Sequence, residues 1–449
     1  MRPREPGRKR RRTSGRAAPI AIGIDTGGTF TDVVVWRRGG LEAFKLPSTP
    51  GAPERAVLAA LARAGASRAT RVRHGSTVAT NALLERKGAR VTFVTTAGFE
   101  DALEIGRQDR PAIYALAPSR PAPLVPAARR LGARERLGVG GEVLVPLTAR
   151  ECRRIAARVR ATKPEAIAIG LLHAWRSGAH ERRLARALRP LGVPLSVSSA
   201  LCPEIREVER FATTAANAFL APRVAAYLGA LARARRGRVE VVLSHGGTAP
   251  VSAAAREPVR QLLSGPAAGL RAALAAARAR GFSVALSLDV GGTSTDCALL
   301  GAGEAGADGL PRRRAREVGG VPVLLPTLDV HTVGAGGGSI PRVDAGGLLH
   351  VGPESAGADP GPACYGRGGP ATVTDALVVL GLLPVDALAG GALALDRTAA
   401  ERALLGVARA LGAHSVHAAA NAVLAIANAR MEAALRVVSV ERGEDPRGA

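Results

Sequence analysis

The sequence predicts an α/β protein built from two related halves with mixed sheets, and three observations lead to this prediction. The eight-residue pattern Asp-x-Gly-Gly-Thr-x-Thr-Asp occurs at residues 25–32 and again at 289–296, and the two copies agree at six positions. Each copy lies between two short runs of strand-forming residues. Helix-like and strand-like segments alternate between the copies, which is typical of layered α/β folds. A repeat of this length in the same setting indicates two related domains.

Each copy of the pattern predicts a β-hairpin that turns at its Gly-Gly pair. In the first copy, residues 20–24 and 33–36 are the expected strands. In the second copy, the corresponding runs are 284–288 and 297–300. Both runs are short and apolar, as expected for buried strands.

The remaining segments predict the domain organisation. Residues 166–172 are expected to form a further strand, and 203–235 a long helix. We expect a disordered basic tail over 1–18, a first domain over 19–201 that carries the first loop, and a second domain over 202–449 that carries the second loop.

Composition excludes several classes of protein. A chain of 449 residues is long enough for two or three domains, and its four cysteines lie too far apart for a zinc motif or a disulfide framework. No apolar run approaches the roughly 20 residues that span a bilayer, so we expect a cytoplasmic protein without membrane contact.

The net charge of +25 has a simple explanation that does not involve nucleic acid. Residues 1–16 hold eight Lys or Arg residues against one acid. Almost all the remaining positive charge is Arg, and no aromatic residues are interleaved with it as in a stacking platform for bases. We therefore expect a solvated tail and no nucleic-acid partner.

The repeated loop carries the chemistry of a phosphate site. Its glycines let backbone N–H groups approach a phosphate closely, its threonine hydroxyls add donors, and its leading carboxylate can hold Mg²⁺ or orient water. One such loop could be an ordinary hairpin, whereas two that face each other can clamp the phosphates of a nucleotide from both sides. The candidate residues are Asp25, Thr26, Gly27, Gly28, Thr29 and Thr31 in the first loop, and Asp289, Gly291, Gly292, Thr293 and Thr295 in the second.

The paired loops resemble the two phosphate loops of the sugar kinase, heat-shock chaperone and actin superfamily, which implies a duplicated actin-like ATPase fold. Finer motifs are similar to the hydantoinase A / 5-oxoprolinase family. They are Ile-Gly-Ile-Asp-Thr-Gly-Gly-Thr-Phe-Thr-Asp at 22–32, His-Gly-Ser-Thr-Val-Ala-Thr-Asn-Ala-Leu-Leu-Glu-Arg at 74–86, Leu-Ser-Gly-Pro-Ala-Ala-Gly at 263–269 and Asp-Val-His-Thr-Val-Gly-Ala-Gly-Gly-Gly-Ser-Ile at 329–340. The likeness runs over nearly the whole chain.

The resemblance implies an ATP-dependent hydrolase subunit. ATP and Mg²⁺ are the expected cofactors, and the reaction opens a cyclic amide of the hydantoin or 5-oxoproline type after phosphoryl transfer to the amide oxygen. A hydantoinase B type subunit is the implied partner in a hetero-oligomer. The alternatives are the ATP-handling subunit of a ketone carboxylase, or a catalytically incomplete nucleotide-binding or assembly partner.

The resemblance also extends the site beyond the two loops. It places His74, Thr77 and Asn81 near the substrate, although a helix cap and a structural histidine would explain the same residues. Asp329 and His331 could bind a second divalent metal, but two ligands do not establish a site. A run of close-approach glycines is the candidate nucleotide loop, namely Gly336, Gly337 and Gly338.

Three shorter motifs are further candidates, and the last two are the weaker ones. Residues 264–269 predict a helix start that could bind an anion or simply begin a helix. Residues 244–247 and 374–375 are explained equally well as solvated turns.

The chain also departs from the family pattern. Relatives usually continue beyond the stretch that resembles 441–447 with a Gly-Gly-Ala-Gly-Pro loop against the adenosine, so we expect a C-terminally truncated member whose last helix, 416–440, has an exposed apolar face. His245 stands where relatives commonly have Asn, and Ala376-Leu377 where they often have Ala-Asn.

Overall fold

The structure is a computed structural model and describes residues 19–28, 30–49, 51–109, 113–116, 121–234, 238–301, 308–357, 359–386 and 394–448. The basic tail over 1–18 and Thr29 of the first loop lie outside the described residues, so the predictions for them are untested.

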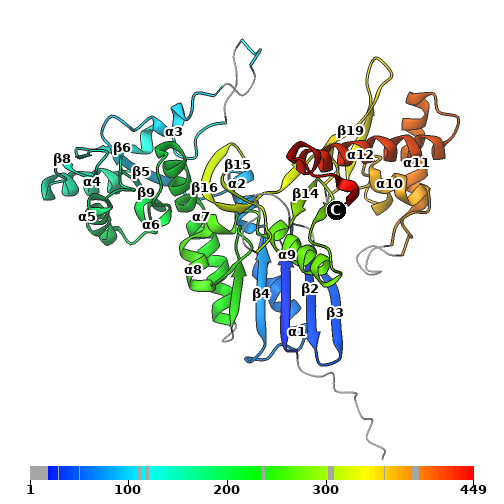
Figure 1. Cartoon of the computed structure of the whole chain (residues 1–449), viewed down its shortest axis with the longest axis horizontal. Coiled ribbons are helices and arrows are strands. Elements are labelled where there is room, and N and C mark those ends of the chain that lie inside the picture. The colour runs from blue at the N-terminus through cyan, green and yellow to red at the C-terminus, as the bar shows by residue number, and fades with distance from the viewer. Residues whose placement is uncertain are drawn as a thin grey trace, which may run out of the picture.

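A six-stranded mixed sheet carries the first hairpin, in the strand order β12-β11-β4-β1-β2-β3 (Figure 1). The central strand β1 pairs antiparallel with β2 and parallel with β4. Apolar residues alternate along β1 and β2, so Ile22, Ile24 and Val33 are buried on one face. The strands are β1 (Ala21–Thr26), β2 (Phe30–Arg37), β3 (Gly40–Pro47), β4 (Arg71–Ser76), β11 (Val239–Val242) and β12 (Thr248–Pro250). The helices nearest to them in sequence are α1 (Pro53–Arg63), α2 (Val78–Leu84) and α8 (Val251–Arg256).

A parallel four-stranded sheet in the order β10-β9-β5-β6 forms a separate layer. The predicted strand at 166–172 is its central strand β9, and its apolar residues are fully buried. The elements are β5 (Val91–Thr96), β6 (Arg130–Ala133), β9 (Ala166–Gly170), β10 (Leu195–Val197), the hairpin β7 (Arg136–Leu137) and β8 (Val143–Val145), and the helices α3 (Ala102–Ile105), α4 (Ala149–Ala161), α5 (Ala179–Leu188) and α6 (Ser198–Leu201).

The long helix predicted at 203–235 is α7, Glu207–Ala234, which continues through Pro222. It contacts β9 of the parallel sheet and α1 and α2 beside the first sheet. Its buried Phe211 and Leu228 share one core with Ile22 and Phe93. That core therefore draws on residues from both sides of the predicted boundary at 201/202, and the boundary itself stays a prediction.

The second hairpin lies in a smaller sheet with the order β13-β14-β17. Helix α9 packs on one face through Leu270 and Leu274, and helix α12 packs on the other through Ala434 and Val438. The elements are α9 (Ser264–Ala279), β13 (Ala285–Val290), β14 (Thr295–Leu300), β17 (His331–Val333) and α12 (Val416–Val438).

A long hairpin from the second half reaches back to α7. It consists of β15 (Arg312–Val318) and β16 (Val321–Leu328). Val318, Val323 and Leu325 belong to the same core as the first sheet, and the N–H of Leu324 donates to Oγ1 of Thr213 over 2.7 Å. The hairpin therefore fastens the two halves together.

The C-terminal region is a hairpin with three helices and a core of its own. Its helices begin at well-formed caps: Thr372 and Asp375 make a capping box, and Asp396 and Ser415 cap the next two helices. The elements are β18 (Ser339–Val343), β19 (Leu349–Ser355), α10 (Val373–Val379), α11 (Arg397–Leu411) and α12.

The predicted α/β class with a duplicated, actin-like arrangement and mixed sheets is confirmed. Within the described ranges, no single helix has the length and apolar character to cross a membrane, and only the pair Arg397–Leu411 and Val416–Arg442, bent by 82°, meets those criteria jointly.

Candidate functional site

The two repeated loops have the same construction in three dimensions. Asp25 lies opposite Asp32 in the first hairpin, and Asp289 lies opposite Asp296 in the second. The turns close in the same way, because the N–H of Gly27 donates to the carbonyl of Phe30 over 3.0 Å and that of Gly291 donates to Ser294 over 2.8 Å. The repeat in the sequence is therefore a repeat in structure.

Helix α9 runs past both leading aspartates and presents a face of small residues to them. A Cβ atom built on Gly265 would lie 3.6 Å from Oδ2 of Asp25, and one built on Gly269 would lie 4.0 Å from Oδ2 of Asp289. Because Gly265 and Gly269 are one helical turn apart, the two carboxylates approach neighbouring positions on the same helix face. Figure 1 shows α9 between the first sheet and the second hairpin.

The start of α9 is fixed against the first half. The hydroxyl of Ser264 donates to the carbonyl of Ser76 over 3.2 Å, and the N–H of Leu263 donates to Oγ1 of Thr80 over 3.0 Å. Leu263 has the left-handed φ of 60°, so the chain turns sharply into the helix here. The predicted helix start at 264–269 is confirmed, and its small residues lie where the two loops meet.

The two aspartates create a crowded negative site. Burial within the loops, followed by the negative charges of Asp32 and Asp289, raises the pKa of Asp25, while Lys45 acts in the opposite direction. Lys45 forms an ion pair with Asp32 over 2.5 Å. The carboxyls of Asp25 and Asp289 have no ion-pair partner among the described residues. A cation placed between them would relieve their repulsion.

A cleft of about 310 Å³ opens beside the first loop. The predicted substrate residues Thr77 and Asn81 line it together with the loop itself. Thr77 is tied to the loop, because its N–H donates to the carbonyl of Thr26 over 3.0 Å, and Asn81 Nδ2 donates to Thr77 Oγ1 over 3.3 Å. The full lining is Thr26, Gly27, Gly28, Ser48, Thr49, Gly51, Pro53, Thr77, Val78, Asn81, Glu85, Lys87 and Arg223.

Some polar groups of the two loops are hydrogen-bonded within the chain, and others have no partner there. The hydroxyl of Thr31 bonds Ser48 over 3.0 Å, and that of Thr295 donates to the carbonyl of Ala335 over 2.6 Å, so both already have partners within the chain. Thr293 is exposed at the turn of the second loop. The N–H groups of Gly28 and Gly292 have no hydrogen-bond partner among the described residues, so each turn keeps an open donor.

The glycine run at 336–338 packs directly on the second loop. The N–H of Gly337 donates to the carbonyl of Gly291 over 2.9 Å, and that of Gly338 donates to Gly292 over 2.6 Å. A Cβ on Gly336 would lie 2.7 Å from the carbonyl oxygen of Gly291, so no other residue fits this position. These glycines shape the second loop, and direct contact with a nucleotide stays a prediction for them.

His74 lies apart from Thr77 and Asn81, inside strand β4. It is fully buried, with one ring nitrogen bonded to the hydroxyl of Tyr227 and the other 3.3 Å from the carbonyl of Ile24. Burial lowers the pKa of His74 to about 4, so the ring is neutral at physiological pH. It does not line the cleft, and its position supports the alternative of a structural histidine.

Asp329 and His331 do not form a metal cluster in the described part of the chain. The Asp329 carboxylate binds Arg313 over 2.6 Å and Arg442 over 2.9 Å, so each oxygen already has a cation. His331 lies on β17 opposite Cys297. Among the described residues, no three His, Cys, Asp or Glu side chains gather as metal ligands.

The two weaker motifs lie in ordered structure. Ser244 is buried, and its hydroxyl donates to the carbonyl of Arg260. Asp375 is fully buried at the start of α10, where it accepts bonds from the N–H groups of Cys364 and Thr372. A solvated turn is therefore the wrong explanation for 374–375, because this carboxylate is a buried helix cap.

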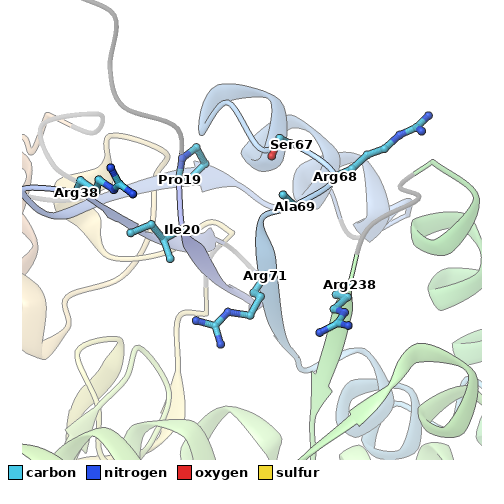
Figure 2. A pocket seen from close by; sticks show the side chains of 8 residues that line it. All are labelled: Pro19, Ile20, Arg38, Ser67, Arg68, Ala69, Arg71 and Arg238. Carbon is cyan, nitrogen blue, oxygen red and sulfur yellow. The ribbon is translucent and has the colours of Figure 1, made fainter.

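A larger cavity of about 700 Å³ lies at the opposite end of the first sheet, where β1 and β4 begin (Figure 2). Arg38, Arg68, Arg71 and Arg238 line it, without a carboxylate among the lining residues. Figure 2 shows that Arg68 extends away from Arg71 and Arg238, so the guanidinium groups do not converge on one point. The cleft beside the first loop remains the better candidate site.

Sequence reasoning missed several residues of the site. Lys45 and Lys87 are two of only four lysines in an arginine-rich chain, and that rarity was a signal available in the sequence. Gly265 and Gly269 carried the spacing of one helical turn, but nothing local showed that two aspartates would lie against them. Arg223 and Tyr227 come from α7, which is distant in sequence from both loops.

Comparisons with known proteins find relatives over nearly the whole chain. The family model described as hydantoinase/oxoprolinase N-terminal region matches residues 21–192, and the model described as hydantoinase/oxoprolinase matches residues 210–449. An uncharacterized protein of Methanocaldococcus jannaschii is 35% identical over 95% of this chain and 66% of its own length. Caprolactamase subunit alpha of Pseudomonas jessenii is 36% identical over 95% of this chain and 64% of its own length.

Two solved structures share the fold. The ATP-dependent caprolactamase of Pseudomonas jessenii superposes with a TM-score of 0.81 and 35% identity over 95% of this chain and 64% of its own. Nucleotide-free acetone carboxylase superposes with a TM-score of 0.78 and 28% identity over 96% of this chain and 64% of its own. The chain thus spans about two thirds of the length of these relatives.

Proposed function

Because the chain belongs to the hydantoinase/oxoprolinase family, we propose that it binds ATP with Mg²⁺ between its two hairpin loops and is the ATP-handling part of an enzyme that opens a cyclic amide. One observation carries the proposal. Asp25 and Asp289, at matching positions of two duplicated hairpins, lie against Gly265 and Gly269 on one face of α9. A site of this kind offers carboxylates and backbone donors, which suits phosphoryl transfer.

In this proposal the two turns hold the phosphates. The open N–H groups of Gly28 and Gly292 and the exposed hydroxyl of Thr293 are the donors that remain for phosphate oxygens. Thr31 and Thr295 support the turns from inside. The small residues of α9 leave room for the phosphate chain between the carboxylates.

The residues present fit a magnesium ion. Mg²⁺ prefers oxygen ligands and is commonly held by one or two carboxylates together with substrate phosphates. Asp25 and Asp289 are such a pair, and their mutual repulsion favours a cation. When bound, the ion would neutralise charge that develops on the transferred phosphoryl group.

The reaction follows from amide chemistry. The amide oxygen forms a bond to the γ-phosphorus as the bond to ADP breaks, which gives an O-phosphorylated imidate. Water then adds to the ring carbon, and the C–N bond breaks with the nitrogen leaving as an amine. A second water releases phosphate from the acyl phosphate and leaves a carboxylate, so ATP hydrolysis drives the ring opening.

The cleft beside the first loop is the proposed place for the amide. Thr77 and Asn81 line it next to Gly28, so a ring bound there would present its oxygen to the phosphate site. Lys87 and Arg223 lie on the same lining as Glu85, which pairs with Lys87 over 2.9 Å, and their net positive charge would attract a carboxylate such as that of 5-oxoproline. A hydantoinase B type subunit is the proposed partner for the later steps.

The likeness to acetone carboxylase supports a second candidate. A ketone, in its enolate form, can also accept a phosphoryl group on oxygen, and the same two loops would serve that step. The two candidates differ in what stimulates ATP hydrolysis: a lactam or hydantoin alone for the first, a ketone together with bicarbonate for the second.

Calorimetry with Mg-ATP tests the nucleotide site directly. We expect the chain to bind Mg-ATP, and Gly265→Ala to weaken binding by about tenfold or more, or about 1.4 kcal/mol, because a methyl group would stand beside Asp25. Gly406→Ala on the exposed face of α11 is the matched control, since nothing lies within 4 Å of its added Cβ. Absence of binding by the parent chain, or equal binding by both variants, would contradict the proposal.

A further inference from the structure

Four exposed arginines surround the cavity at the end of the first sheet where β1 and β4 begin (Figure 2). They come from four separate segments: Arg38 from the turn between β2 and β3, Arg68 from the segment between α1 and β4, Arg71 from the start of β4, and Arg238 from the residue before β11. None of the four side chains has an ion-pair or hydrogen-bond partner among the described residues. Positive charge therefore gathers here without compensation from the described part of the chain.

Two of these arginines lie side by side on neighbouring strands. Strands β4 and β11 run parallel with Arg73 opposite Glu240, which places Arg71 opposite Arg238. Residues two apart on a strand point to the same face, so both cross-strand pairs lie on one face of the sheet. Arg73 and Glu240 form an ion pair over 3.6 Å, whereas Arg71 and Arg238 carry like charges. Like charges on facing strand positions repel each other, so an anion bound across both strands would stabilise this end of the sheet.

The arrangement favours an extended anion over a small one. Figure 2 shows that Arg68 extends away from Arg71 and Arg238, so one phosphate or one carboxylate would contact only some of the guanidinium groups. Apolar residues, among them Pro19 and Ile20, lie between the charges on the lining of this cavity of about 700 Å³. A chain that carries several carboxylates at intervals would reach the separate guanidinium groups and also cover the apolar residues.

The lining favours a polypeptide over a nucleic acid. Among the described residues that line the cavity, there is no aromatic side chain on which a base could stack. The guanidinium group of arginine matches a carboxylate in geometry, because it can donate two parallel hydrogen bonds to the two oxygens. The net charge of +25 also favours association with an acidic partner.

We propose that this cavity binds an acidic segment of a partner polypeptide, whose carboxylates pair with the four arginines. The docking site is separate from the proposed nucleotide site, because Ile20 and Asp25 are five residues apart along an extended strand, or roughly 17 Å. Charge pairing at such an exposed surface mainly sets the rate and the specificity of association, and it weakens as salt is added.

A fluorescein-labelled octaglutamate peptide is the probe, and the octaglutamine peptide is its uncharged control. Fluorescence anisotropy with the full chain measures binding at an ionic strength of about 0.15 M, where charges more than about 8 Å apart are largely screened. We expect octaglutamate to bind and octaglutamine not to bind. Nucleotide is left out, so the result does not depend on the proposed ATP site.

Charge-reversal variants locate the bound peptide. Arg71→Glu combined with Arg238→Glu should weaken octaglutamate binding at least about tenfold. Arg153→Glu combined with Arg409→Glu is the matched control, since these arginines of α4 and α11 are also exposed and without an ion-pair partner among the described residues. Both variants lower the net charge equally, so general attraction to a basic chain is the same, and the control should change binding less than about twofold.

A second variant leaves the strands of the sheet unchanged. Arg38→Glu combined with Arg68→Glu should also weaken octaglutamate binding, by at least about fivefold, with circular dichroism as the check on folding of each variant. Failure of octaglutamate to bind, or equal weakening in the control variant, would overturn the proposal. Tighter binding of an oligonucleotide or of phosphatidylserine vesicles, lost in the same variants, would overturn it as well, because the site would then belong to a nucleic acid or a membrane surface.

Discussion

The two hairpin loops share an eight-residue pattern and a register, yet their surroundings differ. The first loop ends a central strand of a six-stranded sheet, with Ile22 and Ile24 buried beneath it. The second ends an edge strand of a three-stranded sheet, with Leu288 and Val290 exposed. The local sequence thus determines the shape of each turn, whereas segments distant in sequence determine how far Asp25 and Asp289 are buried.

The difference has an electrostatic consequence. Asp25 is surrounded by Asp32, Asp289 and the partly buried loop, and its pKa is raised. Asp289 lies at an exposed strand end. If both loops act on one nucleotide, each aspartate should be essential for turnover, but the charge of Asp25 should cost more folding stability than that of Asp289.

The largest expected effect is the loss of ATP turnover in Asp289→Asn. Removing a charge that holds the metal and phosphates should lower the rate by about a hundredfold or more, while the exposed position leaves the fold intact. Coupled-enzyme measurement of ADP release, with circular dichroism as the check on folding, tests this.

Asp386→Asn provides the control, because Asp386 is an exposed aspartate in a turn far along the chain from both loops. It should retain full turnover. Normal turnover in Asp289→Asn would show that the second loop takes no part in the nucleotide site. The proposal that two loops clamp one nucleotide would then be wrong.

The next effect concerns the buried region beneath the first loop. His74 has a folded-state pKa of about 4, below its ordinary value of 6.5, so the unfolded chain binds the proton first as the pH falls. Stability from this residue is therefore complete above pH 6.5 and decreases as the pH falls toward 4, by about 3 kcal/mol in total.

Urea denaturation at several pH values measures this loss. In His74→Gln, the acid-dependent part should disappear, so the difference in unfolding free energy between the variant and the parent chain shrinks as the pH falls. His414→Gln, at an exposed histidine ahead of α12, should keep the parent's pH dependence. An unchanged pH dependence in His74→Gln would show that the ring does not stay neutral inside β4.

Elements that depend on short-range patterns could be predicted from the sequence, whereas contacts between segments far apart in the chain could not. Both hairpins, α7 and the start of α9 follow from short-range patterns, so they could be located. Strand β4 beside β1 and strand β11 beside β4, by contrast, come from segments far along the chain.

The same distinction holds for the site. Thr77 and Asn81 lie beside the first loop as predicted, because α2 follows directly from the strand that pairs with β1. His74, three residues earlier, faces Tyr227 of α7 instead, and nothing near it in sequence indicated that partner. Asp329 likewise meets Arg442, more than a hundred residues away.

The smallest expected effect is a gain in stability for Asp25→Asn. A carboxyl whose folded-state pKa is raised costs stability at pH values above that pKa, and the cost disappears as the pH falls toward the unfolded value. At neutral pH without metal, Asp25→Asn should therefore melt at a slightly higher temperature than the parent chain, although it cannot turn over ATP.

The gain in melting temperature should fade at acidic pH, and it should exceed the gain in Asp289→Asn, whose carboxylate is exposed. Mg²⁺ should reduce the difference in melting temperature between Asp25→Asn and the parent chain. The ion needs both carboxylates, so it should stabilise the parent chain alone. A melting temperature that is lower than the parent's at neutral pH would mean that the charge of Asp25 stabilises the first loop, and the contrast between a crowded and an open aspartate would then fail.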